Sequence, residues 1–295
     1  MVDLSNENLP VEVQLRREGG RFVRFAGAAG FLAKGLIYIG CGVLILVSAF
    51  QGSSGGNRDE SPQGVFKRVS QMSSGLGVTL LSLLLVGILM YAVWRLFEAV
   101  TAVGLRSEPR RVGKLKAFFS YRLSPFISAC VYLSYAAFCI RLLLSVASSP
   151  VCFPACWRDT VWGTVLLALL GLAFAIAVVT QLIPAVTGSF RKDMRSDRMQ
   201  VHPARGRAFV LLGRVGFLGR AALFASLSAL FFAFVLWPRR ARTSGSTISQ
   251  ALDAFTGKPG GRVILFLIGI TVTCYGVFAA LNAHYKRFTT ESVLP

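Results

Sequence analysis

Charged side chains, and acidic ones above all, are scarce in this chain. Only 15% of its 295 residues are charged, and 13 Asp and Glu stand against 32 Lys and Arg. A soluble domain carries about 25% charged residues, and here the shortage coincides with long uncharged runs. This composition excludes an ordinary cytosolic enzyme, a disordered chain and a disulfide-stapled secreted module.

The sequence also has few of the residues that carry common chemistry. It contains no P-loop, no dinucleotide fingerprint and no Cys-x-x-Cys-His haem motif, each of which depends on fixed spacings. The chain has two histidines, His202 and His284, and neither falls inside the core of a predicted membrane segment. We therefore expect a protein that is not an enzyme, with no catalytic residues, no cofactor and no bound metal.

Long uncharged runs predict six transmembrane helices. A helix needs about 20 mostly apolar residues to cross the hydrocarbon core of a bilayer. The runs do not alternate polar and apolar residues, as a membrane β-barrel would require. They cover residues 35–57, 69–94, 123–140, 161–190, 221–238 and 263–285. Apolar residues continue backwards from the first and fifth runs, so these two helices should begin near residues 25 and 209. The predicted fold class is all-α integral membrane.

The basic residues predict the orientation of the chain. Nineteen of them fall in the segments on the side of both termini, and nine fall on the other side. Basic loops stay in the cytoplasm, so both termini should be cytoplasmic. Contact with anionic lipid headgroups explains a net charge of +19 without a further partner. We predict membrane lipids as partners and no nucleic acid.

An internal repeat divides the chain into three helical hairpins. Lys34 matches Arg220 at an offset of 186 residues, and Tyr91 matches Tyr275 at an offset of 184. A polar tail at 1–21 precedes units at 22–104, 117–190 and 209–288. Units that each cross the membrane twice insert with the same polarity, and such repeats are related by an axis along the membrane normal. The repeat predicts three parallel-inserted hairpins with pseudo-threefold symmetry, and matching glycines predict close helix contacts.

Short apolar motifs stand before the second helix of the first and third units. Val65, Phe66 and Val69 in one unit match Ala251, Leu252 and Phe255 in the other. Apolar residues at helical spacing, bounded by Gly and Pro, predict a short amphipathic helix on the outer surface.

At this point the chain resembles the bacterial membrane proteins of the domain of unknown function 1206. The resemblance rests on a Gly-aromatic opening before a basic residue, an Ala-Leu…Pro-x-Gly turn, and an aromatic ending of the even helices. These motifs are Gly30-Phe31…Lys34, Ala251-Leu252…Pro259-Gly260-Gly261, Tyr91…Trp94 and Tyr275…Phe278. The second unit departs, with Ser124 and Ser128 where Gly and a basic residue would stand. The resemblance implies a six-helix architecture and a bacterial inner or plasma membrane, and it implies no chemistry.

Three equivalent positions carry the candidate intramembrane polar contacts, Lys34, Ser128 and Arg220. An ionisable side chain within a span costs about 2.5–3.5 kcal/mol at mid-helix and is a functional candidate. Two interpretations are open. The two basic side chains either snorkel to the headgroups or face the interior, where they would contact an anion or a lipid headgroup.

Two further pairs are structural candidates. Glu98 follows Arg95 by three residues, so the two share a helix face and should form an ion pair. Cys152 and Cys156 flank a proline on the outer side of the membrane, where a disulfide is chemically feasible.

The leading functional prediction is a non-enzymatic multi-pass membrane protein. It would act as a structural or accessory subunit of a membrane assembly, with other protein subunits as partners, or as a lipid-binding scaffold. The alternative is a small transporter or channel, in which Lys34 and Arg220 line a basic central path.

Overall fold

The computed structural model describes residues 11–51, 59–72, 74–101, 122–145, 160–193, 203–236, 247–253, 255 and 259–285. Six long helices dominate it, and each is long and apolar enough to cross a membrane. They are α1 (Val11–Gln51), α3 (Ser74–Thr101), α6 (Ser124–Leu143), α7 (Val161–Thr187), α9 (Pro203–Leu236) and α11 (Gly261–Tyr285). Three short elements accompany them, α2 (Pro62–Ser70), η5 (Ser189–Asp193) and α10 (Thr247–Asp253). The predicted six apolar helices are confirmed, and the protein is a multi-pass membrane protein.

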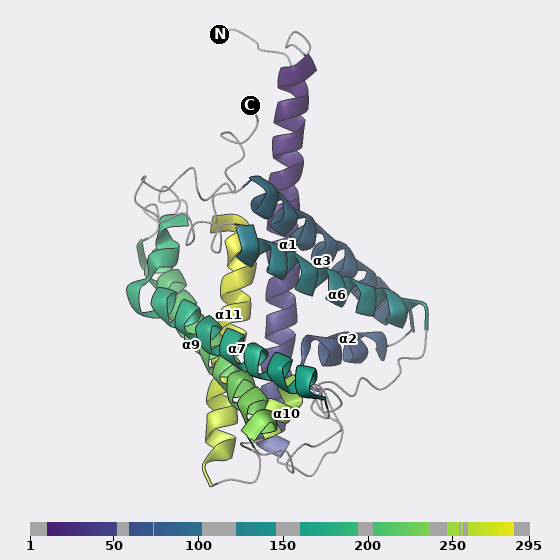
Figure 1. The fold of residues 1–295 in the computed structure, drawn as a ribbon. Coiled ribbons are helices and arrows are strands. Elements are labelled where there is room, and N and C mark those ends of the chain that lie inside the picture. Colours follow the sequence, from purple (N-terminus) through teal and green to yellow (C-terminus); the bar gives the residue numbers. More distant parts are fainter. Residues whose placement is uncertain are drawn as a thin grey trace.

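Two of the long helices begin well before their uncharged runs, as predicted. The candidate span of α1 is Arg24–Phe50 and that of α9 is Gly206–Leu236. Helix α1 itself starts at Val11, and its first turns project beyond the other helices (Figure 1). The second half of the predicted polar tail is therefore helical.

The long helices pack side by side in an order that follows the chain (Figure 1). Helix α3 packs against both α1 and α6, and α9 packs against both α7 and α11. The most extensive interface joins α1 to α11, the first and last of the six. Within the described residues, α6 and α7 are not among the helix pairs in substantial contact. The second predicted hairpin is thus splayed, whereas α1 with α3 and α9 with α11 pack directly.

Glycines form the seam between α1 and α11. A Cβ atom on Gly35 would lie 2.6 Å from the backbone nitrogen of Ala280, and one on Gly276 would lie 2.5 Å from that of Ile39. These distances are shorter than any real Cβ contact, so a larger side chain at either position would push the helices apart. Small residues allow such close approach where lipid gives no hydrophobic drive for association.

Both predicted short helices are present, as α2 and α10, and their apolar faces turn into the bundle. Phe66 of α2 is fully buried and packs against Tyr135 and Phe138 of α6, with ring centroids 6.2 and 6.4 Å apart. Ala251 and Leu252 of α10 are 2% and 3% exposed. The two helices therefore fill space between long helices instead of lying flat on the surface.

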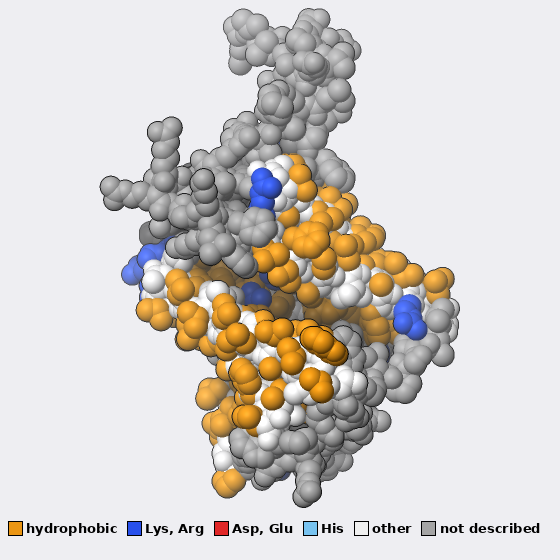
Figure 2. Space-filling model, viewed as in Figure 1, with side chains coloured by type: hydrophobic (Ala, Val, Ile, Leu, Met, Phe, Trp, Pro, Cys, Tyr) orange, Lys and Arg blue, Asp and Glu red, His pale blue; other side chains and the backbone are white. Residues whose placement is uncertain are grey.

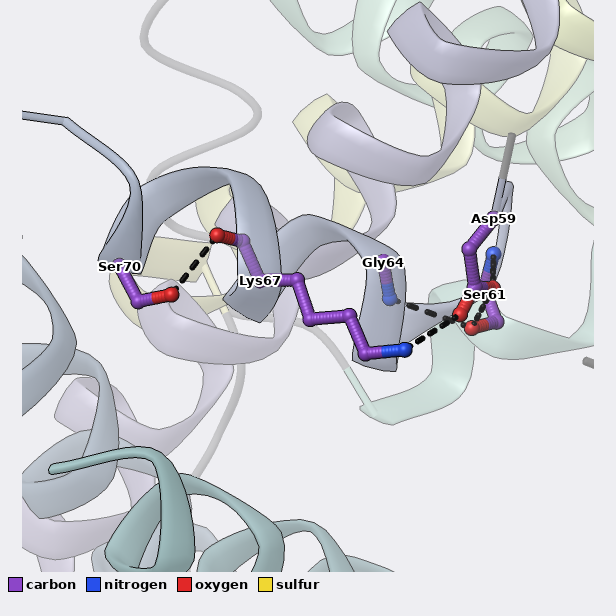
Figure 3. Close-up of polar contacts among 5 residues, drawn as sticks. All are labelled: Asp59, Ser61, Gly64, Lys67 and Ser70. Carbon is purple, nitrogen blue, oxygen red and sulfur yellow. Dashed lines mark hydrogen bonds and ion pairs between the residues drawn. The ribbon is translucent and has the colours of Figure 1, made fainter. Parts of the chain in front are cut away.

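The turn that starts α2 is held by its own polar side chains (Figure 3). Ser61 is the N-cap, and its hydroxyl accepts a hydrogen bond from the backbone nitrogen of Gly64 at 3.3 Å. Asp59 accepts hydrogen bonds from the backbone and the hydroxyl of Ser61, and Lys67 pairs with the Asp59 carboxylate at 3.8 Å. At the other end of the helix, Ser70 donates to the Lys67 carbonyl at 2.7 Å. A serine cap followed by proline at the first helical position is a strong helix start.

The outward faces of the helices are apolar, as lipid contact requires. Half of the most apolar 18-residue stretch of α1 is buried inside the bundle, whereas 11% of the corresponding stretch of α7 is buried. Trp162 and Val186 of α7 are 84% and 73% exposed. Hydrophobic side chains cover the visible surface of the long helices in Figure 2. In water such a surface would favour aggregation, whereas in a bilayer it is the expected exterior.

Candidate functional site

Lys34 of α1 points into the bundle. Its side chain is 6% exposed, and its ammonium donates a hydrogen bond to the Tyr91 hydroxyl of α3 at 3.1 Å. The same nitrogen lies 5.8, 5.1 and 5.6 Å from the ring centroids of Phe31, Tyr91 and Tyr275. Of the two interpretations left open by the sequence, the structure therefore places Lys34 in the interior and not among the headgroups.

Arg220 of α9 makes the matching set of contacts from the other side. Its Nη1 donates to the Tyr275 hydroxyl of α11 at 3.0 Å. The guanidinium lies 4.7, 5.6 and 5.1 Å from the ring centroids of Tyr275, Tyr38 and Phe224. A cation over a desolvated aromatic face gains about 2 kcal/mol, so the rings partly offset the burial of both charges.

Together these residues form one cluster, which we call the basic–tyrosine cluster. Its members come from α1, α3, α6, α9 and α11, and they are Lys34, Tyr38, Tyr91, Tyr132, Arg220 and Tyr275. Tyr38 packs on Tyr275 with ring centroids 4.8 Å apart, and Tyr91 packs on Tyr132 at 4.4 Å. Lys34 lies ten residues after the first residue of its candidate span, and Tyr91 and Tyr275 lie ten residues before the last residues of theirs. Because α1 runs opposite to α3 and α11, all three lie about 15 Å along the helix axis from one end of the bundle.

The cluster holds two cations and no described carboxylate. The ion pairs among the described residues are Lys67–Asp59 and Arg95–Glu98, and neither includes Lys34 or Arg220. The two cations share one aromatic neighbour, because Lys34 and Arg220 both lie beside the Tyr275 ring. Nε of Arg220 is buried and makes no hydrogen bond within the described structure. The arrangement offers a donor and two positive charges to an anion.

Ser128 occupies the third equivalent position, and its role as a polar contact stays a prediction. It is half-buried on α6, and the α6 residue that reaches the cluster is Tyr132, one turn further along. Tyr132 is 7% exposed. Helix α6 thus contributes the aromatic ring of Tyr132 to the cluster, in contact with the Tyr91 ring.

Arg95 and Glu98 form an ion pair on α3, with Nη1 and Oε2 2.6 Å apart. Their side chains are 23% and 18% exposed. The guanidinium of Arg95 also lies 5.5 Å from the Tyr91 ring centroid, so this neutral pair flanks the basic–tyrosine cluster without cancelling its charge.

Among the described residues, the other candidate groups do not form a second site. Cys152 and Cys156 lie outside the described residues. Within the part of the chain that the structure describes, no group of three or more His, Cys, Asp or Glu could hold a metal ion. The four described cysteines, Cys41, Cys130, Cys139 and Cys274, are free thiols.

Sequence reasoning missed the role of the tyrosines. Tyr91 and Tyr275 mark the repeat in the sequence, and together with Tyr38 and Tyr132 they are four of the seven tyrosines in the chain. A useful signal was available, because Tyr38 and Tyr132 each stand four residues after a candidate polar position. That spacing places each pair on one helix face.

The comparisons with known proteins agree with this architecture. The family model described as Domain of Unknown Function (DUF1206) matches residues 29–102 and 215–286. The uncharacterized protein YxxB of Bacillus subtilis (strain 168) is 23% identical over 285 residues, which cover 94% of this chain and 96% of that protein. No solved structure matches the chain significantly. The regions 29–102 and 215–286 of this chain belong to the DUF1206 family.

Proposed function

We propose that this protein is a non-enzymatic membrane scaffold whose basic–tyrosine cluster binds the anionic headgroup of a membrane lipid. The observation that carries the proposal is that buried Lys34 and partly buried Arg220 both lie inside the bundle, without a described carboxylate beside them. Each charge costs about 2.5–3.5 kcal/mol at mid-helix, and the aromatic faces return only part of that. An anion would balance both charges at once.

The ligand is better matched to a phosphate than to a neutral group. A guanidinium presents donors in a planar fork that fits phosphate oxygens, and a lysine ammonium adds a point charge. Nε of Arg220 is a buried donor that still needs an acceptor. In a protein surrounded by lipid, phospholipid headgroups are the most abundant source of phosphate.

We further propose that the bundle has pseudo-threefold symmetry with a diverged second unit. A Cβ on Gly30 would lie 2.5 Å from Cα of Tyr91, and one on Gly216 would lie 2.5 Å from Cα of Tyr275. Each of these glycines stands four residues before its basic residue, Lys34 or Arg220. The two matched stretches of the family model coincide with the first and third units.

Both termini are proposed to face the cytoplasm. The excess of basic residues on that side supports this orientation, and the first turn of α1 and the last turn of α11 lie at the same end of the bundle (Figure 1). The proposed location is the plasma membrane of a bacterium.

Transport of an anion along a central path is the competing proposal, since Lys34 and Arg220 face one interior region. Four tyrosine rings occupy that region beside the cations, which favours a binding site over a conduction path. Flux measurements in liposomes separate the two. Anion flux that disappears when Lys34 and Arg220 are replaced would favour the transporter.

The lipid proposal is tested by thermal unfolding of delipidated protein in detergent. Phosphatidylglycerol at 100 times its Kd should add about 2.7 kcal/mol of stability, or about 5 °C in Tm, whereas phosphatidylcholine should add almost none. In the double variant Lys34→Met, Arg220→Met the phosphatidylglycerol response should vanish. Met replaces a buried charge without leaving an unpaired partner charge, so the variant should fold.

Arg262→Met is the matched control, because Arg262 is an exposed arginine at the start of α11. It should retain the full lipid response. An equal response in the wild type and the double variant would contradict the proposal. The scaffold role is tested separately by native gels of mildly solubilised membranes, where migration far above 31.9 kDa with co-purifying proteins is expected.

A further inference from the structure

The two helices that do not pack together frame a hollow. Helix α6 packs on α3 and α2, and helix α7 packs on α9 and η5. Figure 2 shows a recess between the apolar bands of these two helices, with Lys or Arg side chains on its floor. The gap between α6 and α7 therefore opens sideways, toward the surrounding lipid.

On each side of the gap between α6 and α7, aromatic residues connect the helix to the cations. On the α7 side, Phe174 contacts Phe224 at 5.7 Å between ring centroids, and Phe224 lies 5.1 Å from the Arg220 guanidinium. On the α6 side, Tyr132 contacts Tyr91, whose hydroxyl accepts the hydrogen bond from Lys34. Arg220 is partly exposed, unlike Lys34.

The depth of the cations explains why a sideways opening matters. Lys34 lies ten residues into the candidate span Arg24–Phe50, which is about 15 Å along the helix axis from the start of that span. A headgroup can reach that depth only by moving into the bundle while its acyl chains remain in hydrocarbon. Apolar side chains on both helices suit those chains, because Phe126, Ile127 and Val131 of α6 are exposed, as are Leu169 and Leu172 of α7.

We infer that the gap between α6 and α7 is a lateral portal for one anionic phospholipid, whose phosphate passes between these helices to Arg220 and Lys34 while its acyl chains stay between α6 and α7. This inference rests on the proposed function and adds the route and the location of the acyl chains. Charge complementarity selects the occupant, because the floor is cationic and the rim is apolar.

The portal predicts where a photoactivatable lipid will attach. Full-length protein in nanodiscs would be irradiated with phosphatidylglycerol that carries a diazirine near the headgroup end of one acyl chain, and labelled peptides would be mapped by mass spectrometry. Label should concentrate on residues beside the gap, among them Tyr132, Phe174 and Phe224. Unlabelled phosphatidylglycerol should displace it, and inorganic phosphate should not.

Two comparisons make the test decisive. The equivalent phosphatidylcholine probe and the double variant Lys34→Met, Arg220→Met should each show about tenfold less label at the gap, the change that the loss of a charged hydrogen bond produces. Arg262→Met should label like the wild type. Displacement by inorganic phosphate would identify a soluble anion as the ligand and overturn the portal.

The failure of the portal can be told apart from the failure of the proposed function. If phosphatidylglycerol stabilises the protein through Lys34 and Arg220 but label is spread evenly over the outer faces of all helices, the headgroup site stands and the portal is wrong. If neither stabilisation nor site-specific label depends on the two cations, both proposals are wrong.

Discussion

The two sides of this bundle are held together very differently. At the α1–α11 seam, glycines bring two backbones into contact, whereas α6 and α7 stand apart although they are consecutive transmembrane helices. In lipid, apolar surface alone does not drive helices together. They associate where small residues or hydrogen bonds allow close packing. The comparison teaches that two helices consecutive in the chain need not pack together, and the loosely held side is where we propose that a lipid enters.

A bulky substitution at the α1–α11 seam should have the largest effect on stability. Gly276→Leu places a side chain against the backbone of Ile39, where even a Cβ would lie 2.5 Å from its nitrogen. Overpacking costs about 1–3 kcal/mol and occasionally more, and here backbone cannot yield as a flexible side chain would. We expect a marked drop in Tm in detergent and early aggregation on size exclusion.

The matched control uses a glycine with space around it. Gly75 of α3 has nothing within 4 Å of the position that a Cβ would take, so Gly75→Leu should leave Tm nearly unchanged. Equal losses for Gly75→Leu and Gly276→Leu would show that the seam is not a tight contact.

Loss of the Arg95–Glu98 ion pair, beside the basic–tyrosine cluster, should have an intermediate effect on the free energy of unfolding. Glu98→Gln removes the carboxylate that Arg95 contacts at 2.6 Å, and a hydrogen bond to a charged group contributes about 1.5–3 kcal/mol. Lys67→Met breaks the other ion pair, in which Lys67 is 51% exposed, and should cost less than about 1 kcal/mol. Denaturant titration of both variants should give this order; the reverse order would mean that Arg95 finds another partner.

The smallest expected effect belongs to a hydrogen bond between α7 and α9. Ser228 donates to the Gly171 carbonyl at 2.9 Å, and such interhelical bonds contribute about 0.6 kcal/mol in membrane proteins. Ser226→Ala is the control, because Ser226 donates to the Ala222 carbonyl of its own helix at 3.0 Å. A larger loss for Ser226→Ala than for Ser228→Ala would contradict this assignment.

Much of the fold could be predicted from the sequence because lipid imposes simple rules. Uncharged runs of sufficient length marked all six long helices, and apolar triplets bounded by Gly and Pro marked α2 and α10. The matching positions of Lys34 and Arg220 also singled out the two cations that meet in one cluster.

The remainder depended on how each helix is rotated. Helices α1 and α9 are apolar almost all round, since lipid covers one face and other helices cover the rest, so periodicity does not indicate which side faces inward. That is why both snorkelling and burial of Lys34 were consistent with its sequence position. The separation of α6 from α7 had no local signal, because it results from each helix packing better against another neighbour, α3 or α9.

The central claim is that an anionic lipid completes the charge of the basic–tyrosine cluster. A cryo-electron microscopy map of the protein in nanodiscs that contain phosphatidylglycerol tests it most directly. The account predicts headgroup density within hydrogen-bonding distance of Arg220, with acyl-chain density continuing between α6 and α7. A map in which α6 and α7 pack together over the cluster, with no density beside Lys34 or Arg220, would contradict it.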